Sequence, residues 1–352
     1  MPRPLPRPLT RPLTRPLPQY LVGVDGGGTG TRARLQDADG RTLGTGQAGP
    51  SGLGLGVEQA WRHVREAVEQ SFAKALAQAA MPARPPLHQV ALGLGLAGAG
   101  VPAQSAAFLQ MDPGFARCVL RNDGLTQLLG AHPEGAGLVV ASGTGSVAMA
   151  RSADGRMRQA GGWGFPVGDE GSGAWLGLHA MRHAQHVLDG RVAPSPLSQA
   201  VMRQAVMQQA VMHQAGTDAA ALLAWCAGAG QNTWAQLAPL VFDAAEAGDA
   251  QAQTLLQAAA DALAALVRTL DMTLDLSRDS TLDISRYLTR DLTPNSGLLP
   301  GAPIVMCGSV GERLLPRWPE ALRSRLVAPA GDSADGALRL LRAALAGEAW
   351  AS

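Results

Sequence analysis

The sequence predicts an α/β protein made of two domains. Its 352 residues suffice for two hydrophobic cores of ordinary size. Two stretches, 21–35 (LVGVDGGGTGTRARL) and 137–151 (GLVVASGTGSVAMAR), share one plan: a strand, a turn rich in glycine and hydroxyl residues, and a second strand. Alternating helical and strand patterns follow each stretch, as α/β architecture requires. The repeated plan therefore predicts two domains of related architecture.

Four elements are predicted in the first half of the chain. Residues 20–25 form a short apolar strand, and residues 31–47 alternate polar and apolar positions around the turn dipeptide Asp39-Gly40, which predicts a hairpin. Apolar residues recur at a spacing near 3.6 over 57–79, which predicts a helix. The run 89–98 is apolar and ends in glycines, which indicates a buried strand.

The second half begins with a strand over 118–123, with Asp123 at its end, that runs into a helix over 124–131. The hairpin 137–151 follows, and a helix is expected after the glycine-rich segment 161–173. An apolar strand, APIVM (302–306), precedes the last helical pattern. Helices and strands thus alternate in this half as in the first.

Three low-complexity repeats interrupt this order. Residues 3–18 repeat every four residues with frequent proline, which excludes a helix and predicts a disordered polyproline-like tail; a proline-motif ligand or a basic anchor is the alternative. Residues 201–215 repeat every five residues, which turns the Val-Met pair by about 140° per repeat on a helix. The triplet TLD recurs at 269, 273 and 281. We interpret the three as a tail, a lengthened helix or loop, and an insert, because surface insertions cost little free energy.

Composition excludes several function classes. The net charge of +1 argues against a nucleic-acid or membrane-surface partner held by bulk charge, and no apolar run approaches the length of a transmembrane helix. Three cysteines, Cys118, Cys226 and Cys307, lie far apart without metal-ligand spacing, which fits a reducing cytoplasm. We expect small-molecule partners in the cytoplasm, and leave a homodimer open.

The two glycine-rich turns predict an anion site. Such a turn points several backbone N–H groups at one spot, and threonine hydroxyls add donors. The turns DGGGTGT (25–31) and SGTGS (142–146) can together clamp one polyphosphate. Neither is a P-loop, because no Gly-Lys-Ser/Thr follows. Asp25 is then placed to hold Mg²⁺ beside the phosphates. The alternative for either turn alone is an ordinary tight hairpin.

A series of motifs in fixed order indicates a resemblance to a known family. They are GVDGGGTGTRARL (23–35), GLGLAGAG (93–100), NDG (122–124), ASGTGSV (141–147), GGWGFPVGDEGSG (161–173), AEAGDAQA (245–252), IVMCGSVGERL (304–314) and DGALRLL (335–341). The chain resembles the N-acetylglucosamine/glucosamine kinase family (BadF/BadG/BcrA/BcrD-type ATPases) of the sugar kinase/heat-shock ATPase/actin superfamily, and bacterial glucosamine kinases most of all. It is similar also to the activator ATPases of benzoyl-CoA reductase.

The resemblance implies two actin-like (ribonuclease H-like) domains hinged around a cleft that binds ATP and, deeper, a sugar. A tail over 1–19 would precede the N-terminal domain, 20–121, which a C-terminal helix at about 335–352 would complete. The C-terminal domain would span 122–334, with repeat inserts near 201–215 and 273–300. Mg²⁺ would accompany ATP.

The resemblance also implies residue roles. Asp123 would be the catalytic carboxylate that accepts the proton of the sugar hydroxyl, although NDG by itself also indicates a turn. ATP and its phosphates would be bound by Gly26, Gly27, Gly28, Thr29, Thr31, Gly143, Thr144, Gly145, Gly308 and Ser309. The sugar would be bound by Asp123, Ser146, Val147, Gly162, Trp163, Gly164 and Asp169, with Glu170 as an alternative to Asp169.

The expected activity is an ATP-dependent amino-sugar kinase that phosphorylates the 6-hydroxyl of glucosamine or N-acetylglucosamine. Alternatives are an N-acetylglucosamine kinase proper, an activator ATPase that drives a partner protein, and a sugar-sensing regulator. Gly52 stands where the family usually has a sugar-contacting Asn, and Trp163-Gly164 follows the acetylglucosamine kinases, so the substrate indications conflict. His179, His183 and His186 fall on one helical face, where a zinc site is the alternative to a solvated surface.

Overall fold

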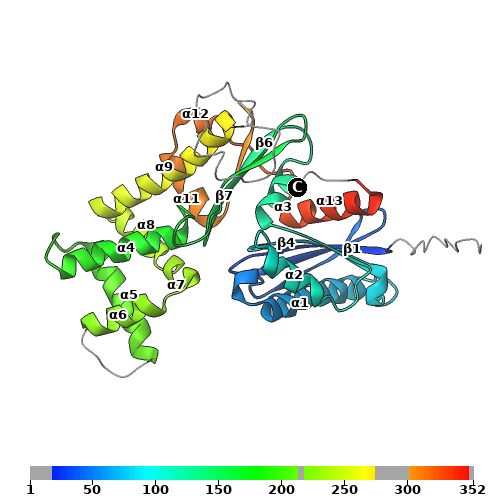
Figure 1. Cartoon of the computed structure of the whole chain (residues 1–352), viewed down its shortest axis with the longest axis horizontal. Coiled ribbons are helices and arrows are strands. Elements are labelled where there is room, and N and C mark those ends of the chain that lie inside the picture. Colours follow the sequence, from blue (N-terminus) through cyan, green and yellow to red (C-terminus); the bar gives the residue numbers. More distant parts are fainter. Residues whose placement is uncertain (1–17, 213–217, 274–300, 349–352) are drawn as a thin grey trace, which may run out of the picture.

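The computed structural model describes residues 18–212, 218–273 and 301–348. Its ribbon forms two lobes, each built on one sheet (Figure 1). The predicted tail at 1–17, the end of the five-residue repeat at 213–217 and most of the TLD repeats lie outside the described residues. In the described segments no helix combines the length and apolar character needed to cross a membrane.

The first lobe is built on a five-stranded sheet with the order β3-β2-β1-β4-β5. Its strands are β1 (Tyr20–Gly26), β2 (Thr31–Asp37), β3 (Thr42–Ala48), β4 (Val90–Leu96) and β5 (Arg117–Arg121). The first three pair antiparallel through short turns, whereas β4 is parallel to both β1 and β5. Parallel neighbours need a longer crossover, which α1 (Val57–Ala77) and α2 (Pro102–Gln110) supply.

The second lobe repeats this arrangement in a four-stranded sheet with the order β8-β7-β6-β9. Its strands are β6 (Gly137–Ser142), β7 (Ser146–Arg151), β8 (Met157–Gly161) and β9 (Ile304–Cys307). Again three strands pair antiparallel in chain order, and a distant strand, β9, adds in parallel beside β6. The two sheets confirm the mixed α/β fold and the duplicated plan that the sequence predicts.

Helices cover both sheets and supply most of the remaining chain. Besides α1 and α2, they are α3 (Asp123–Ala131), α4 (Gly173–Leu188), α5 (Pro196–Met212), α6 (Asp218–Gly228), α7 (Gln231–Ala235), α8 (Ala238–Glu246), α9 (Ala250–Thr273), α11 (Ser309–Leu314), α12 (Glu320–Arg323) and α13 (Ser333–Ala346). The largest core lies in the second lobe, where α4, α8 and α9 bury alanine and leucine side chains against β6 and β7. In the first lobe α1 covers one face of the sheet and α13 the other.

A pair of helices, α3 and α13, lies between the two sheets (Figure 1). Leu128 and Ala131 of α3 pack on Val139 and Val305 of the second sheet. The helix α13 instead packs on the first sheet, where Leu338 and Leu341 meet Leu21 and Ala91. The two helices therefore join the lobes through their mutual contact.

Glycines, which have no side chain, allow α13 to pack closely on β4 and on α3. A methyl group on Gly93 of β4 would overlap the carbonyl oxygen of Ala337, and one on Gly130 of α3 would overlap that of Asp332. Arg34 of β2 also holds the start of α13, because its guanidinium bonds both Asp332 and Asp335. Glycine is thus required where backbone meets backbone.

The predicted elements are found with one correction at Asp123. The strand β5 ends at Arg121, and Asp123 is the first residue of α3 instead of the last residue of a strand. Asn122 caps this helix, because its Oδ1 accepts the N–H of Leu125 at 2.8 Å. The motif NDG therefore begins a helix and is not a hairpin turn.

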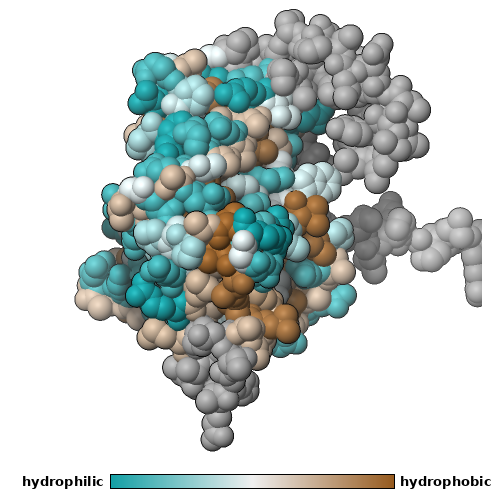
Figure 2. All heavy atoms as spheres, turned by 90° about the vertical axis from the view of Figure 1, so that its left-hand side faces the viewer, coloured by the Kyte–Doolittle hydropathy of each residue, from teal (hydrophilic) through white to brown (hydrophobic). Residues whose placement is uncertain are grey.

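Apolar side chains gather on the outer end of the second lobe, where α4, α5 and α6 lie (Figure 2). Leu188, Met207 and Leu223 of these helices are 50%, 67% and 72% exposed. Exposed apolar surface of this kind often contacts another protein chain.

Replacing Gly93 by alanine tests the packing of α13. The added methyl overlaps the Ala337 carbonyl, so the helix must move, and we expect the free energy of unfolding to fall by about 1–3 kcal/mol. The melting temperature, measured by circular dichroism, should drop. Gly228→Ala is the matched control, since nothing lies within 4 Å of the added group. Equal melting temperatures for Gly93→Ala and the wild type would contradict the packing.

Candidate functional site

The two glycine-rich turns face each other across the lobes. The first turn closes with a 3.0 Å hydrogen bond from Gly27 N–H to the Gly30 carbonyl, and the second with an equal bond from Gly143 to Gly145. A Cβ atom at Gly28 would lie 3.8 Å from Thr144 Oγ1, whereas Gly27 and Gly143 have open space beside them. Turns far apart in the chain thus meet at one place, as a shared polyphosphate site requires.

The second turn is fixed by the start of α4. Gly173 N–H donates to the Gly143 carbonyl at 2.8 Å, and Ala174 N–H donates to the Thr144 carbonyl at 3.2 Å. The Ser142 hydroxyl adds a 2.8 Å bond to the carbonyl of Gly171. These bonds satisfy the carbonyl groups of the turn, so that its shape does not depend on a ligand.

The residues predicted to bind adenosine lie beside this second turn. Gly308 follows β9 with a φ of +88°, and a side chain there would overlap the Ser142 carbonyl. Gly308 is therefore required for the close approach of β9 to β6 at this end. Ser309 is exposed at the start of α11. Gly308 thus adjoins Gly143.

Two carboxylates approach the site from the first lobe and from α3. Burial raises the pKa of Asp25, against a hydrogen bond from Ser333 that lowers it. Burial, together with the neighbouring charge of Asp25, raises the pKa of Asp123 to about 6. Two acidic groups that repel each other favour either a shared proton or a cation. Pairs of this kind are typical of functional sites.

Two hydroxyl groups that the sequence did not indicate bond the Asp25 carboxylate and the main chain of Asp123. Ser333, the first residue of α13, bonds Asp25, and its Oγ lies 2.7 Å from Thr126 Oγ1. Thr126 Oγ1 is also 3.0 Å from the carbonyl oxygen of Asp123. Because Ser333 lies 207 positions after Thr126, no local pattern could have revealed this contact.

Asp169 is buried and already well bonded. Burial raises its pKa, while N–H groups of Ser146 and Gly164 and the amide of Gln231 bond the carboxylate and lower it. Gln231 Nε2 donates to Asp169 Oδ2 at 2.7 Å. The backbone of Asp169 has a φ of +61°, which is unusual for a residue with a side chain. Gln231 is a site residue that sequence reasoning missed.

The segment around Gly162 reaches the start of α3 through Val147. A Cβ atom at Gly162 would lie 2.9 Å from Val147 Cγ2, and one at Gly124 would lie 3.3 Å from Val147 Cγ1. The predicted sugar segment and the neighbour of Asp123 therefore flank the same side chain. Trp163, in contrast, is 75% exposed.

Two predicted side chains face the protein instead of the cleft. Thr31 is buried, and its Oγ1 lies 2.6 Å from the Gly49 carbonyl oxygen and 2.7 Å from Ser51 Oγ. The Ser146 hydroxyl donates to the Glu170 carbonyl at 2.8 Å. Each hydroxyl has a single proton to donate, which these bonds use to support the turns; the predicted ligand roles of Thr31 and Ser146 stay predictions. Thr29, on the first turn, is exposed.

Gly52 lies directly against the first turn. Its N–H donates to the Gly27 carbonyl at 3.0 Å, and its φ of −58° and ψ of 131° suit any residue. A Cβ atom there would lie 3.6 Å from Gly27 O and 3.7 Å from Ala97 Cβ, which is ordinary contact. The fold therefore accommodates the asparagine that the resemblance leads one to expect.

The three histidines of α4 have separate surroundings. His179 Nδ1 lies 2.9 Å from the Trp175 carbonyl oxygen, and His183 Nε2 lies 3.2 Å from Ser195 Oγ. Within residues 18–212, 218–273 and 301–348, no three His, Cys, Asp or Glu side chains are grouped to hold a metal. The zinc alternative gains no support.

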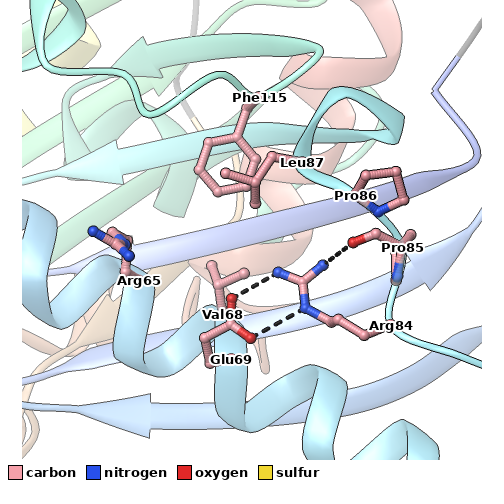
Figure 3. A pocket seen from close by; sticks show the side chains of 8 residues that line it. All are labelled: Arg65, Val68, Glu69, Arg84, Pro85, Pro86, Leu87 and Phe115. Atoms are coloured by element: carbon pink, nitrogen blue, oxygen red, sulfur yellow. Dashed lines mark hydrogen bonds and ion pairs between the residues drawn. The ribbon is translucent and has the colours of Figure 1, made fainter.

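A pocket of about 340 Å³ lies away from the turns (Figure 3). It is lined from α1 by Arg65, Val68 and Glu69, and from the segment before β4 by Arg84 and Leu87. Arg84 bonds the Glu69 carboxylate and lies 3.8 Å over the Phe72 ring. Arg84 is therefore already paired. None of the residues that line the pocket is a predicted site residue.

Comparison with known proteins identifies the family. The model of the BadF/BadG/BcrA/BcrD ATPase family matches residues 22–289, which include both turns, Asp25, Asp123 and Asp169. The chain belongs to this family. The expected family and the two-domain α/β sugar-kinase fold are thereby confirmed, together with the relatives below.

Two curated relatives are sugar kinases. Glucosamine kinase GspK of Vibrio cholerae is 34% identical over 244 residues, which cover 69% of this chain and 77% of that protein. An N-acetylmuramic acid/N-acetylglucosamine kinase of Clostridium acetobutylicum is 30% identical over 178 residues, or 49% of this chain and 56% of that one. A crystal structure from Chromobacterium violaceum, assigned as an N-acetylglucosamine kinase, is 40% identical, with a TM-score of 0.75 over 93% of this chain and all of that one.

Proposed function

We propose that this protein is an ATP-dependent amino-sugar kinase that phosphorylates the 6-hydroxyl of glucosamine or N-acetylglucosamine, giving the sugar 6-phosphate and ADP. The observation that carries the proposal is the meeting of the two turns, as Gly28 and Thr144 show, in a chain whose relatives include a glucosamine kinase. Asp25 and Asp123, which interact electrostatically, supply the acidic groups that phosphoryl transfer needs.

The two turns bind and orient the phosphates. Their backbone N–H groups provide donors, and the open space beside Gly27 and Gly143 leaves room for a ligand. Gly308 adjoins the second turn, so adenosine extends along the second lobe. The γ-phosphate then lies between the lobes, where Asp123 can be reached.

Asp123 acts as the general base. It accepts the proton of the sugar 6-hydroxyl as that oxygen bonds the γ-phosphorus, while the bond to the ADP oxygen breaks. A pKa near 6 leaves the carboxylate mostly ionised at neutral pH and still basic enough to accept a proton. The hydrogen bond from Gly124 N–H to Asp123 Oδ1, 3.0 Å long, orients the group.

Asp25 and its surroundings fit Mg²⁺. The repulsion between Asp25 and Asp123 would be relieved by a cation, and Mg²⁺ is usually bound by one or two carboxylates together with substrate phosphates. The ion, when bound, would neutralise charge on the phosphates. Asp25 would hold it, directly or through water, and Ser333 would orient the Asp25 carboxylate.

A sugar panel tests the function. Purified full-length protein is mixed with ATP, Mg²⁺ and one sugar at a time, and ADP release and the site of phosphorylation are measured. We expect glucosamine or N-acetylglucosamine to be phosphorylated at the 6-hydroxyl, and glucose to react more slowly. ATP hydrolysis without sugar should be slow, because the site is assembled from both lobes. An absence of sugar-stimulated ADP release would refute the proposal.

Asp123→Asn should abolish turnover and keep binding. The change is nearly isosteric and removes only the proton acceptor, so kcat should fall about 10²–10⁴-fold while the affinities for ATP and sugar persist. Asp39→Asn, an exposed carboxylate in the first hairpin, is the matched control. A folded Asp123→Asn variant with wild-type kcat would remove Asp123 from the mechanism.

The pH dependence of kcat/KM of the wild type is a second test of the role of Asp123. Asp123 works only when deprotonated, so kcat/KM should decline as the pH falls through about 6 and level off above it. The Asp123→Asn variant should lack this limb.

Gly52→Asn tests how this chain recognises its sugar. The added side chain fits beside Gly27 and Ala97 and supplies a hydrogen-bonding group, so sugar binding should tighten by about 0.5–1.5 kcal/mol. Isothermal titration with glucosamine and N-acetylglucosamine measures the change. Unchanged or weaker binding would mean that the pocket is built around the glycine, and that the amino sugar is misassigned although the kinase is not.

A further inference from the structure

One side chain of the second lobe reaches the first glycine-rich turn. Asn232 Nδ2, at the start of α7, donates to the Gly28 carbonyl oxygen at 3.3 Å. Its Oδ1 lies 3.1 Å from where a Cβ atom of Gly28 would stand. The same Cβ atom would lie 3.8 Å from Thr144 Oγ1 of the second turn. The amide of Asn232 therefore sits where the two turns meet.

The helix that carries Asn232 is firmly seated in the second lobe. Trp234 of α7 is buried, and its Nε1 donates to the Ala229 carbonyl at 3.0 Å. A methyl group on Gly177 of α4 would overlap the Trp234 carbonyl, so α7 and α4 pack backbone to backbone. Since α4 is bonded to Gly143 and Thr144, Asn232 is fixed relative to the second turn.

The preceding residue links the same helix to Asp169. Gln231 Nε2 donates to the Asp169 carboxylate, which also accepts the N–H of Ser146 just after the second turn. The two consecutive amide side chains thus bond to different lobes. Gln231 binds within the second lobe, and Asn232 binds across to the first. A rotation of one lobe against the other would leave the first bond intact and break the second.

We propose that Asn232 is a positioning residue that holds the first turn at the separation from the second turn at which both contact the ATP phosphates. The inference deepens the proposed function and rests on it. The bond requires a donor at position 232, because Gly28 presents a carbonyl oxygen. Asn232 acts through the turn and not on the transferred group, so its loss should weaken ATP use without moving the pH limb of Asp123.

Two substitutions separate the hydrogen bond from packing. Asn232→Ala removes the donor, and kcat/KM for ATP at saturating sugar should fall roughly two- to tenfold, the value of one hydrogen bond. Asn232→Asp keeps the shape but turns an acceptor toward the Gly28 carbonyl, so its loss should be greater. Gln199→Ala, which removes an exposed amide from α5 of the same lobe, is the matched control and should behave like the wild type.

Three readouts decide the outcome: kcat/KM for ATP, the affinity of a fluorescent ATP analogue without sugar, and the melting temperature. We expect kcat/KM for ATP and the affinity for the analogue to fall from the wild type to Asn232→Ala and further to Asn232→Asp. The three proteins should have equal melting temperatures. Wild-type kcat/KM in Asn232→Asp would overturn it, and so would a lowered melting temperature in both variants, which indicates a merely structural role. If the wild type phosphorylates no sugar, the proposed function is wrong. The affinities of the wild type and the two variants for the ATP analogue then still test the role of Asn232.

Discussion

The contact between α3 and α13 is the constraint on which the rest of the molecule depends. One helix packs on the second sheet and the other on the first, and the two pack against each other, so their contact joins the lobes. Glycines at 130 and 336 bring their backbones together without side chains between them. The same contact puts Ser333 and Thr126 side by side, and with them Asp25 and Asp123. The helix contact that joins the lobes therefore also brings the two carboxylates of the site together.

The site combines groups that would be unfavourable in isolation. Burying Asp25 near Asp123 raises both pKa values, and Asp169 adopts a left-handed backbone conformation. Such features persist where the surrounding structure over-determines them. Here the surroundings are hydroxyl groups, backbone N–H groups and a glutamine amide, all of which bond these carboxyl groups or their backbone. A kinase that must exclude water gains from carboxylates placed before its substrates arrive.

Much of this arrangement could be predicted from the sequence, and the reason is local. The strands, the hairpins and the two turns follow from patterns within 5–20 residues, and the order of the motifs identified the family. What could not be predicted depends on contacts between distant residues. Nothing near Gln231 or Asn232 indicates that their amides reach Asp169 and Gly28. The strand that carries Thr31 likewise does not reveal that Gly49 accepts its hydroxyl proton.

The position of α13 in the chain has a consequence for biosynthesis. One face of the first sheet, with Leu21 and Ala91, packs on Leu338 and Leu341 of α13 (residues 333–346). On the ribosome this apolar face emerges long before α13 is synthesised. The amino-terminal lobe therefore cannot complete the packing of this face until residues 333–346 have been translated. Until then the apolar face is exposed, and transiently exposed apolar surface makes a folding chain prone to aggregation.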